Sequence, residues 1–182
     1  MKKGFLVSLF TCCFVILGNA QVSTGIEVQW YPAGYQFMLT GEYSLNEAHA
    51  IQAKFGYNLA RRKGFSPYND LENGGGLGAT LGYRYYFGAE NSSLYLGARA
   101  DIWALTIDWE DESETPNAGT TKITVFQPTG EIGYMYTFEE SPLAIGVNVA
   151  AGYEINVVTK GEAVGEGAIG LFGIIMRYRV FE

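Results

Sequence analysis

The sequence has little of the material from which most catalytic and metal sites are made. Among its 182 residues there are two cysteines, Cys12 and Cys13, and one histidine, His49. Both cysteines lie within the first twenty residues, which excludes a disulfide framework and a cysteine metal site in the rest of the sequence. Charged residues make up only 17% of the sequence. Few residues are therefore available for acid–base or metal chemistry.

The sequence also lacks an apolar run long enough for a membrane-spanning helix. Its longest run, residues 5–17, has 13 residues, whereas such a helix needs about 18. Two lysines precede the run and small residues follow it, which is typical of a secretory signal peptide. A lipoprotein leader is the alternative, but Phe10 and Thr11 stand where it would need small residues. We expect a signal peptide at 1–20 and a mature domain at 21–182.

Basic residues are scarce. Once Lys2 and Lys3 leave with the leader, ten basic and nineteen acidic residues remain, a net charge of −9. A chain of this charge is repelled by nucleic acid, which we exclude as a partner.

Aromatic residues, at 15%, and glycines, of which there are 24, are abundant, and this composition favours strands and tight turns over helices. From Gly25 onward polar and apolar residues alternate, with turn-rich gaps and no helical periodicity. Alternation with a period of two predicts β-strands that have two different faces. Eight such segments are present, at 25–31, 35–45, 49–61, 75–87, 93–109, 122–138, 143–157 and 167–181.

The connections between these segments alternate between two classes. Three are short, "NEA", "GAENS" and "EESP", and three are longer and polar, "RKGFSPYNDLENGG", "EDESETPNAGTT" and "VTKGEAVGEG"; only the short first connection, "PAG", breaks the order. Short turns at one end and longer loops at the other are typical of outer-membrane barrels. We therefore predict an all-β fold, an eight-stranded antiparallel up-and-down transmembrane β-barrel with short periplasmic turns, longer outer loops and a filled lumen.

Each segment has one apolar face, which leaves two kinds of barrel open. A soluble, lipocalin-like barrel puts that face inside, and an outer-membrane barrel puts it outside. The leader, the small residues on the polar faces and the aromatic residues near segment ends favour the membrane barrel. The expected aromatic girdles are Tyr83, Tyr85, Phe87, Tyr134, Tyr136, Phe138 and Tyr178 on the periplasmic side, and Trp30, Tyr35, Tyr153, Trp103 and Trp109 on the other, with both of the last two tryptophans at the mouth of the lumen.

With the polar faces inside, five acidic and five basic residues share the lumen. An eight-stranded barrel is just wide enough for side chains to fill, so long charged side chains must pair there. Glycines on the same faces leave them room. The predicted network, structural in role, consists of Glu27, Glu42, Lys54, Arg84, Arg99, Asp101, Glu131, Glu154, Arg177 and Arg179.

The predicted register suggests particular neighbours in this network. Glu27 and Arg177 should lie at a similar depth where the first and last strands meet. Arg99 and Asp101 are same-face neighbours about 7 Å apart. For Arg84 we expect a partner among Glu42, Asp101 and Glu131. A proton or ion path is the functional alternative to this structural reading.

The C-terminal segment "GIIMRYRVFE" resembles the C-terminal recognition strand of outer-membrane β-barrel proteins, although it ends in Glu182 instead of an aromatic residue. With the leader and the eight segments, the sequence resembles small barrels of the OmpA-barrel or OmpX type from a Bacteroidota-like bacterium. The resemblance implies insertion into the bacterial outer membrane by the barrel-assembly machinery, contact with outer-membrane lipid and lipopolysaccharide, and a monomer.

A catalytic site is not expected. Barrel enzymes that modify lipid A need a nucleophile with a histidine base, but His49 follows a short periplasmic turn and has no serine at strand spacing. The acidic stretch Glu110, Asp111, Glu112 and Glu114 could bind divalent cations that bridge lipopolysaccharide, but a solvated loop is favoured because the stretch lacks the ligand spacing typical of calcium sites. We expect no cofactor and no metal, and a role in envelope integrity, adhesion or partner binding. A lipid A modifying enzyme and a soluble barrel that binds a hydrophobic ligand remain the alternatives.

Overall fold

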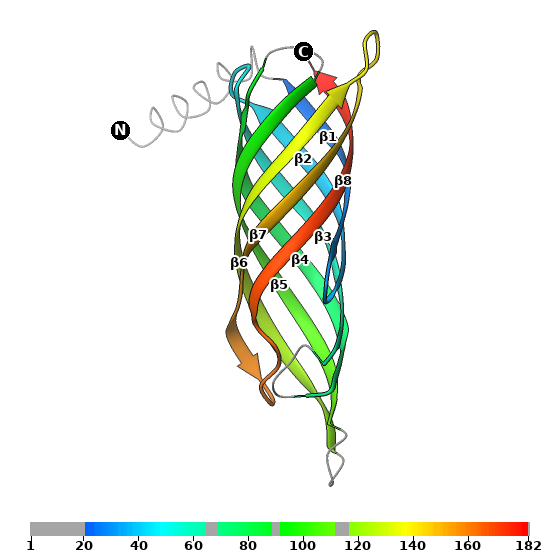
Figure 1. The fold of residues 1–182 in the computed structure, drawn as a ribbon, viewed down its shortest axis with the longest axis vertical. Coiled ribbons are helices and arrows are strands. Elements are labelled where there is room, and N and C mark those ends of the chain that lie inside the picture. The colour runs from blue at the N-terminus through cyan, green and yellow to red at the C-terminus, as the bar shows by residue number, and fades with distance from the viewer. Residues whose placement is uncertain (1–20, 65–68, 89–91, 112–116, 182) are drawn as a thin grey trace, which may run out of the picture.

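The computed structural model describes residues 21–64, 69–88, 92–111 and 117–181, and within them eight strands close into one barrel (Figure 1). These residues contain no helix long and apolar enough to cross a membrane. The strands are β1 (Val22–Tyr31), β2 (Gly34–Ser44), β3 (His49–Lys63), β4 (Leu71–Tyr86), β5 (Ser92–Asp111), β6 (Asn117–Thr137), β7 (Leu143–Lys160) and β8 (Gly167–Phe181).

Each strand pairs antiparallel with the next, and β1 pairs with β8 to close the sheet. The closing ladder runs from Ser23 opposite Arg179 to Trp30 opposite Phe172. The first strand begins and the last strand ends at the same end of the barrel, which we call the terminal end, and the opposite end is the distal end (Figure 1). The predicted all-β fold, a closed barrel of eight antiparallel strands, is confirmed.

Side chains alternate between the outside and the lumen, because successive residues of a strand point to opposite faces. The outer face is apolar and exposed: Leu39 is 66% exposed and Leu81 is 65% exposed. The inner face is buried and carries charged residues such as Glu27 and Lys54. An apolar exterior around a polar interior is the arrangement of a membrane barrel and the reverse of a lipocalin.

Most of the aromatic residues predicted for the two girdles lie on the outer face, and two tryptophans do not. All seven residues of the terminal-end set are exposed on the outer face, as are Trp30, Tyr35 and Tyr153 near the distal end. Trp103 and Trp109, in contrast, are buried on the lumen side. They are covered because β5 continues to Asp111 and the connection after β7 folds over them, with Val164 packed into the same apolar cluster.

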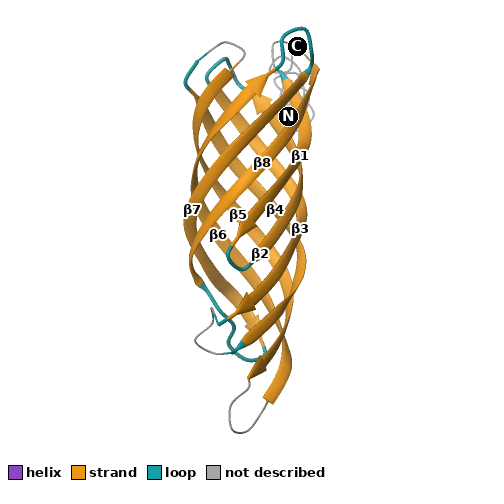
Figure 2. Ribbon diagram, turned by 45° about the vertical axis from the view of Figure 1, so that its right-hand side comes forward, coloured by secondary structure: helices purple, strands orange, loops and turns teal. Residues whose placement is uncertain are grey.

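The walls of the barrel differ in height. The turn between β1 and β2, residues 32–33, lies partway along the wall, while the hairpin of β5 and β6 extends far beyond it (Figure 2). The connections predicted as long loops are shorter than expected, because β3 continues to Lys63, β5 to Asp111 and β7 to Lys160. Much of their polar sequence therefore belongs to strands that project from the distal end.

Pro128 lies within β6, although a barrel has no edge strand on which a missing N–H is harmless. It is paired with Ala100 of β5. On the other side, the ladder with β7 contains the pairs Phe126–Ile155 and Thr129–Gly152 and no pair between them. The proline thus sits at a local gap in the β6–β7 ladder, where no donor is required.

Glycines in the lumen make room for large side chains. A Cβ atom on Gly78 would lie 2.2 Å from the Cε3 atom of Trp103, whose side chain is fully buried. Gly170 of β8 is exposed instead, and a Cβ atom there would meet nothing within 4 Å.

We predict that Gly78→Ala lowers the free energy of unfolding by about 1–3 kcal/mol, because the methyl group overpacks against the indole. The matched variant Gly170→Ala should change it by less than about 0.5 kcal/mol. Urea titration of the refolded barrel in lipid vesicles measures both values. Equal effects of the two substitutions would show that the lumen at Trp103 is not closely packed.

Candidate functional site: the charged lumen

The structure brings most of the predicted lumen residues into one series of contacts. Ion pairs join Glu27, Glu42, Lys54, Arg84, Arg99, Asp101, Glu131, Glu154 and Arg177, and Arg179 lines the cavity at the terminal end. They form three clusters along the barrel, which we call the terminal, central and distal clusters.

The terminal cluster is centred on the carboxylate of Glu42. Nη1 of Arg84 donates to it at 3.0 Å, the hydroxyl of Tyr86 lies 2.9 Å from both of its oxygens, and Arg177 donates from β8. The guanidinium of Arg84 also lies over the ring of Tyr95, 4.5 Å from its centroid. One carboxylate thus holds together side chains from β2, β4 and β8.

Arg84 and Arg99 join the terminal cluster to the central cluster through Glu131. Nε of Arg84 lies 2.7 Å from Oε1 of Glu131, and Nη1 of Arg99 lies 3.6 Å from Oε2. Nε of Arg99 also lies 3.3 Å from Oδ2 of Asp101, its predicted same-face neighbour. Of the three partners considered for Arg84, Glu42 and Glu131 contact it; Asp101 instead accepts a hydrogen bond from Thr80.

Glu27 has its own partner in the central cluster. Nζ of Lys54 lies 2.6 Å from Oε2 of Glu27, and Nδ2 of Asn148 donates to Oε1 at 2.8 Å. All three side chains are buried. An amine and an amide from two strands on opposite sides of β1 therefore neutralise and hydrogen-bond this carboxylate.

Glu27 and Arg177, expected at a similar depth, are offset by two residues in the closing ladder. In the ladder between β1 and β8, Arg177 lies opposite Gly25, and Glu27 lies opposite Ile175. Arg177 reaches past Gly25 of β1 to Glu42 of β2.

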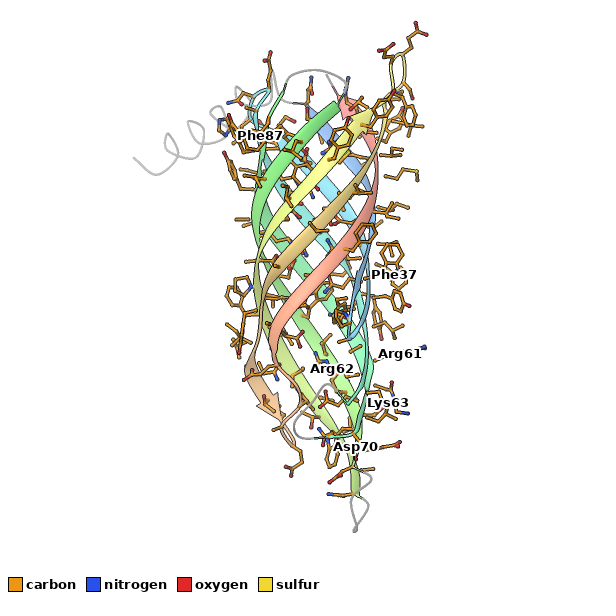
Figure 3. The ribbon with its side chains drawn as sticks, viewed as in Figure 1. Phe37, Arg61, Arg62, Lys63, Asp70 and Phe87 are labelled. Carbon is orange, nitrogen blue, oxygen red and sulfur yellow. The ribbon has the colours of Figure 1, made fainter. Side chains whose placement is uncertain are left out.

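The distal cluster contains two residues that were not predicted, Arg62 and Glu72. Arg62 lies between two carboxylates: Nη1 is 3.2 Å from Oε2 of Glu72, and Nη2 pairs with Glu154. Figure 3 shows Arg62 inside the barrel, whereas its neighbours Arg61 and Lys63 point away from it. Both residues continue the in–out alternation of their strands, which is the sequence signal that could have found them.

The distal cluster also fastens the connection between β7 and β8 over the mouth of the barrel. The backbone N–H of Gly165 donates to Glu72 at 3.1 Å, and its carbonyl accepts a hydrogen bond from Arg62 at 2.5 Å. Val164, beside it, is 2% exposed. The distal mouth is therefore covered by a connection that both ionic and apolar contacts hold in place.

The terminal mouth is more open. A cavity of about 880 Å³ lies there, lined by polar side chains that include Glu42, Tyr86, Arg177 and Arg179. Its floor is the terminal cluster, whose side chains are already paired with one another. The arrangement is a polar vestibule above a closed plug.

The candidates for chemistry outside the lumen do not form a site. His49 lies on the outer surface, where its Nδ1 pairs with the hydroxyl of Tyr83 and its ring contacts Tyr85. Glu112 and Glu114 of the acidic stretch lie outside the described residues. Among the residues that are described, His, Asp and Glu side chains form no group of three or more able to hold a metal ion.

Arg84 links the terminal cluster to the central cluster, because its guanidinium contacts both Glu42 and Glu131. We predict that Arg84→Met lowers the free energy of unfolding by about 3–5 kcal/mol, since Glu42 and Glu131 each lose a cation in a buried site. Arg177→Leu should cost less, because Glu42 keeps Arg84 and Tyr86. Urea titration in lipid vesicles gives the order of the two effects.

The exposed Arg61 supplies the control, and Arg61→Met should leave the free energy of unfolding within about 0.5 kcal/mol of the wild-type value. If Arg84→Met behaved like Arg61→Met, the lumen charges would not form a network that stabilises the barrel.

Comparison with known proteins gives the fold. No family model matches the sequence, and no curated protein is similar enough to match. Neisserial surface protein A matches with a TM-score of 0.56 at 12% identity, over 88% of this chain and 96% of that one. A major outer membrane protein from Thermus thermophilus matches at 0.54 and 12% identity, over 88% and 99%. The N-terminal β-barrel domain of Pseudomonas aeruginosa OprF matches at 0.50 and 13%, over 88% and 98%.

Identities this low show the fold alone, and an origin in a Bacteroidota-like bacterium stays a prediction. The matches nevertheless span nearly the whole of each neighbour. The closed antiparallel ladder, the apolar exterior and these matches all indicate the same fold. The chain has the fold of the small eight-stranded outer-membrane β-barrels.

Proposed function

We propose that the protein is an integral outer-membrane β-barrel without catalytic activity, and that it acts in envelope integrity, adhesion or partner binding through its distal end. The observation that carries this proposal is the pairing of the lumen charges. Carboxylates such as Glu42 and Glu131 are held by arginines and contact no serine, cysteine or histidine among the described residues. Side chains so engaged support the barrel and are not available as acids or bases.

The orientation follows from the ends of the barrel. The connections at the terminal end, residues 45–48, 87–91 and 138–142, are all short. The distal end carries the projecting hairpin of β5 and β6 and the connection that covers the lumen (Figure 2). Because outer-membrane barrels have short periplasmic turns, we place the terminal end in the periplasm and the distal end outside the cell.

Further parts of the proposal concern processing and partners. Residues 1–20 act as a signal peptide, and the barrel-assembly machinery inserts the rest as a monomer. The exposed apolar face then contacts outer-membrane lipid and lipopolysaccharide. Similarity in fold to a neisserial surface protein supports a role at the cell surface.

The membrane assignment predicts heat-modifiable migration. The mature protein should run faster in a cold detergent gel than after boiling, because a closed barrel remains folded in cold detergent. It should also require detergent for extraction from membranes. Extraction in aqueous buffer alone, with one migration rate at both temperatures, would instead support a soluble barrel that binds a hydrophobic ligand.

The absence of catalysis predicts an unchanged lipid A. Mass spectra of lipid A from cells with and without the protein should show the same acyl chains, since the described residues offer His49 no serine partner. The variant His49→Ala should give the same spectrum as the wild type. A change in acylation that His49→Ala abolishes would identify the protein as a lipid A modifying enzyme.

A further inference from the structure

A β-bulge near the distal end changes which face of β7 points outward. Val125 of β6 pairs with Asn156, but the residue before it, Thr124, pairs with Val158, so β7 carries one extra residue, Val157. Val157 and Val158 are both exposed, at 54% and 46%. Beyond the bulge the alternation of β7 is therefore shifted by one residue.

The shift places two lysines side by side on the outer surface. Even-numbered residues of β7 such as Glu154 face the lumen, but Lys160, after the bulge, is exposed. It lies directly opposite Lys122 of β6, which is also exposed. Directly opposed residues of a ladder have Cβ atoms about 5 Å apart, and like charges there are destabilising.

The acidic residue beside Lys122 on the outer face is Asp108 of β5, which lies opposite Thr120 and accepts a hydrogen bond from its hydroxyl. None of the ion pairs among the described residues includes either lysine. On the other side of Lys122 the ladder places Thr106 of β5, an exposed residue with a hydroxyl group. Two positive charges and a hydroxyl on neighbouring strands are suited to a tetrahedral oxyanion.

The surroundings of the pair identify the source of that anion. Toward the terminal end, the outer face of β7 carries Tyr153, Ile155 and Val157, which are exposed and apolar. The lysines therefore stand at the distal border of the band that contacts acyl chains. A membrane lipid places its phosphate at this border and its acyl chains along the band, whereas free phosphate uses only the lysines.

We propose that Lys122 and Lys160 form a binding site for the phosphate group of a phosphorylated glycolipid in the outer leaflet. The site rests on the proposed orientation, in which the distal end faces outside. Each ammonium group donates to a phosphate oxygen, and the phosphate removes the repulsion between the lysines. The bulge is the structural feature that creates the site, because without it Lys160 would face the lumen.

Arg61 and Lys63 of β3 provide a matched control. They are basic residues that also point outward at this end (Figure 3). Across the ladder they face Asn73 and Leu71, so neither is opposed by a like charge. A double substitution there removes the same charge without removing an opposed pair.

The first test compares lipid binding. The mature protein in neutral dodecyl maltoside micelles is titrated with bisphosphorylated lipid A, and bound lipid is counted by native mass spectrometry. We expect Lys122→Gln with Lys160→Gln to weaken binding about thirtyfold, because each ammonium group loses a charge-assisted hydrogen bond to the phosphate. The loss of affinity caused by Arg61→Gln with Lys63→Gln should be several times smaller than the loss caused by the double lysine variant. Dephosphorylated lipid A should bind both variants and the wild type equally.

The second test uses the sign of a stability change. In micelles without lipid A, the Lys122→Gln, Lys160→Gln variant should melt about 1–4 °C above the wild type, because the repulsion is gone. With bisphosphorylated lipid A the wild type should have the higher melting temperature, because it gains more from the bound phosphate. For the variant at Arg61 and Lys63, the sign of the difference in melting temperature from the wild type should be the same with and without lipid A.

Several results would overturn the site. Equal loss of binding in both double variants would show a general attraction to basic surface, and no loss in either would show that the lysines bind nothing. Inorganic phosphate that raises the wild-type melting temperature as much as lipid A would identify a free-anion site. Heat-modifiable migration, measured on the same samples, separates these results from a failure to form a membrane barrel.

Discussion

The ladder between β1 and β8 is the constraint from which the rest of the structure follows. In hydrocarbon each unpaired backbone N–H or C=O costs several kcal/mol, so a sheet can enter the membrane only if it has no edges. Closure with eight strands leaves a lumen that side chains must fill. The alternation of polar and apolar residues, the lumen glycines and the paired charges are all consequences of that closure.

Closure also explains how so many charges can be buried in a small barrel. A single buried carboxylate is costly, but lumen carboxylates here receive several donors from different strands. Glu42 joins β2 to β4 and β8, and Glu131 joins β6 to β4 and β5. Contacts across the lumen add to the hydrogen bonds around the wall, and they fix which strands face one another.

The alternation was enough to predict the strands, their antiparallel order and the face of each lumen charge. It did not predict partners, because pairing depends on register, as where Arg177 lies opposite Gly25 and pairs with Glu42 instead of Glu27. Arg62 and Glu72 were missed because polar and glycine-rich sequence was read as loop, although the strands continue through it. Trp103 and Trp109 had the parity of the lumen, but only the fold of the chain beyond β7 shows what covers them.

The predicted strand at 143–157 is shorter than β7, which continues to Lys160, and the difference has a physical cause. The predicted segment ends at residue 157, because the next residues, "VTKGEAVGEG", have the composition of a loop; Val158, apolar like Val157, also breaks the alternation there. That break is the bulge: Val157 and Val158 both face outward, and the residues after them exchange sides. A loop would also break the alternation, and a period-two pattern cannot distinguish it from one inserted residue in a continuing strand. The break in the pattern therefore falls where the strand turns Lys160 from the lumen toward the membrane surface, beside Lys122.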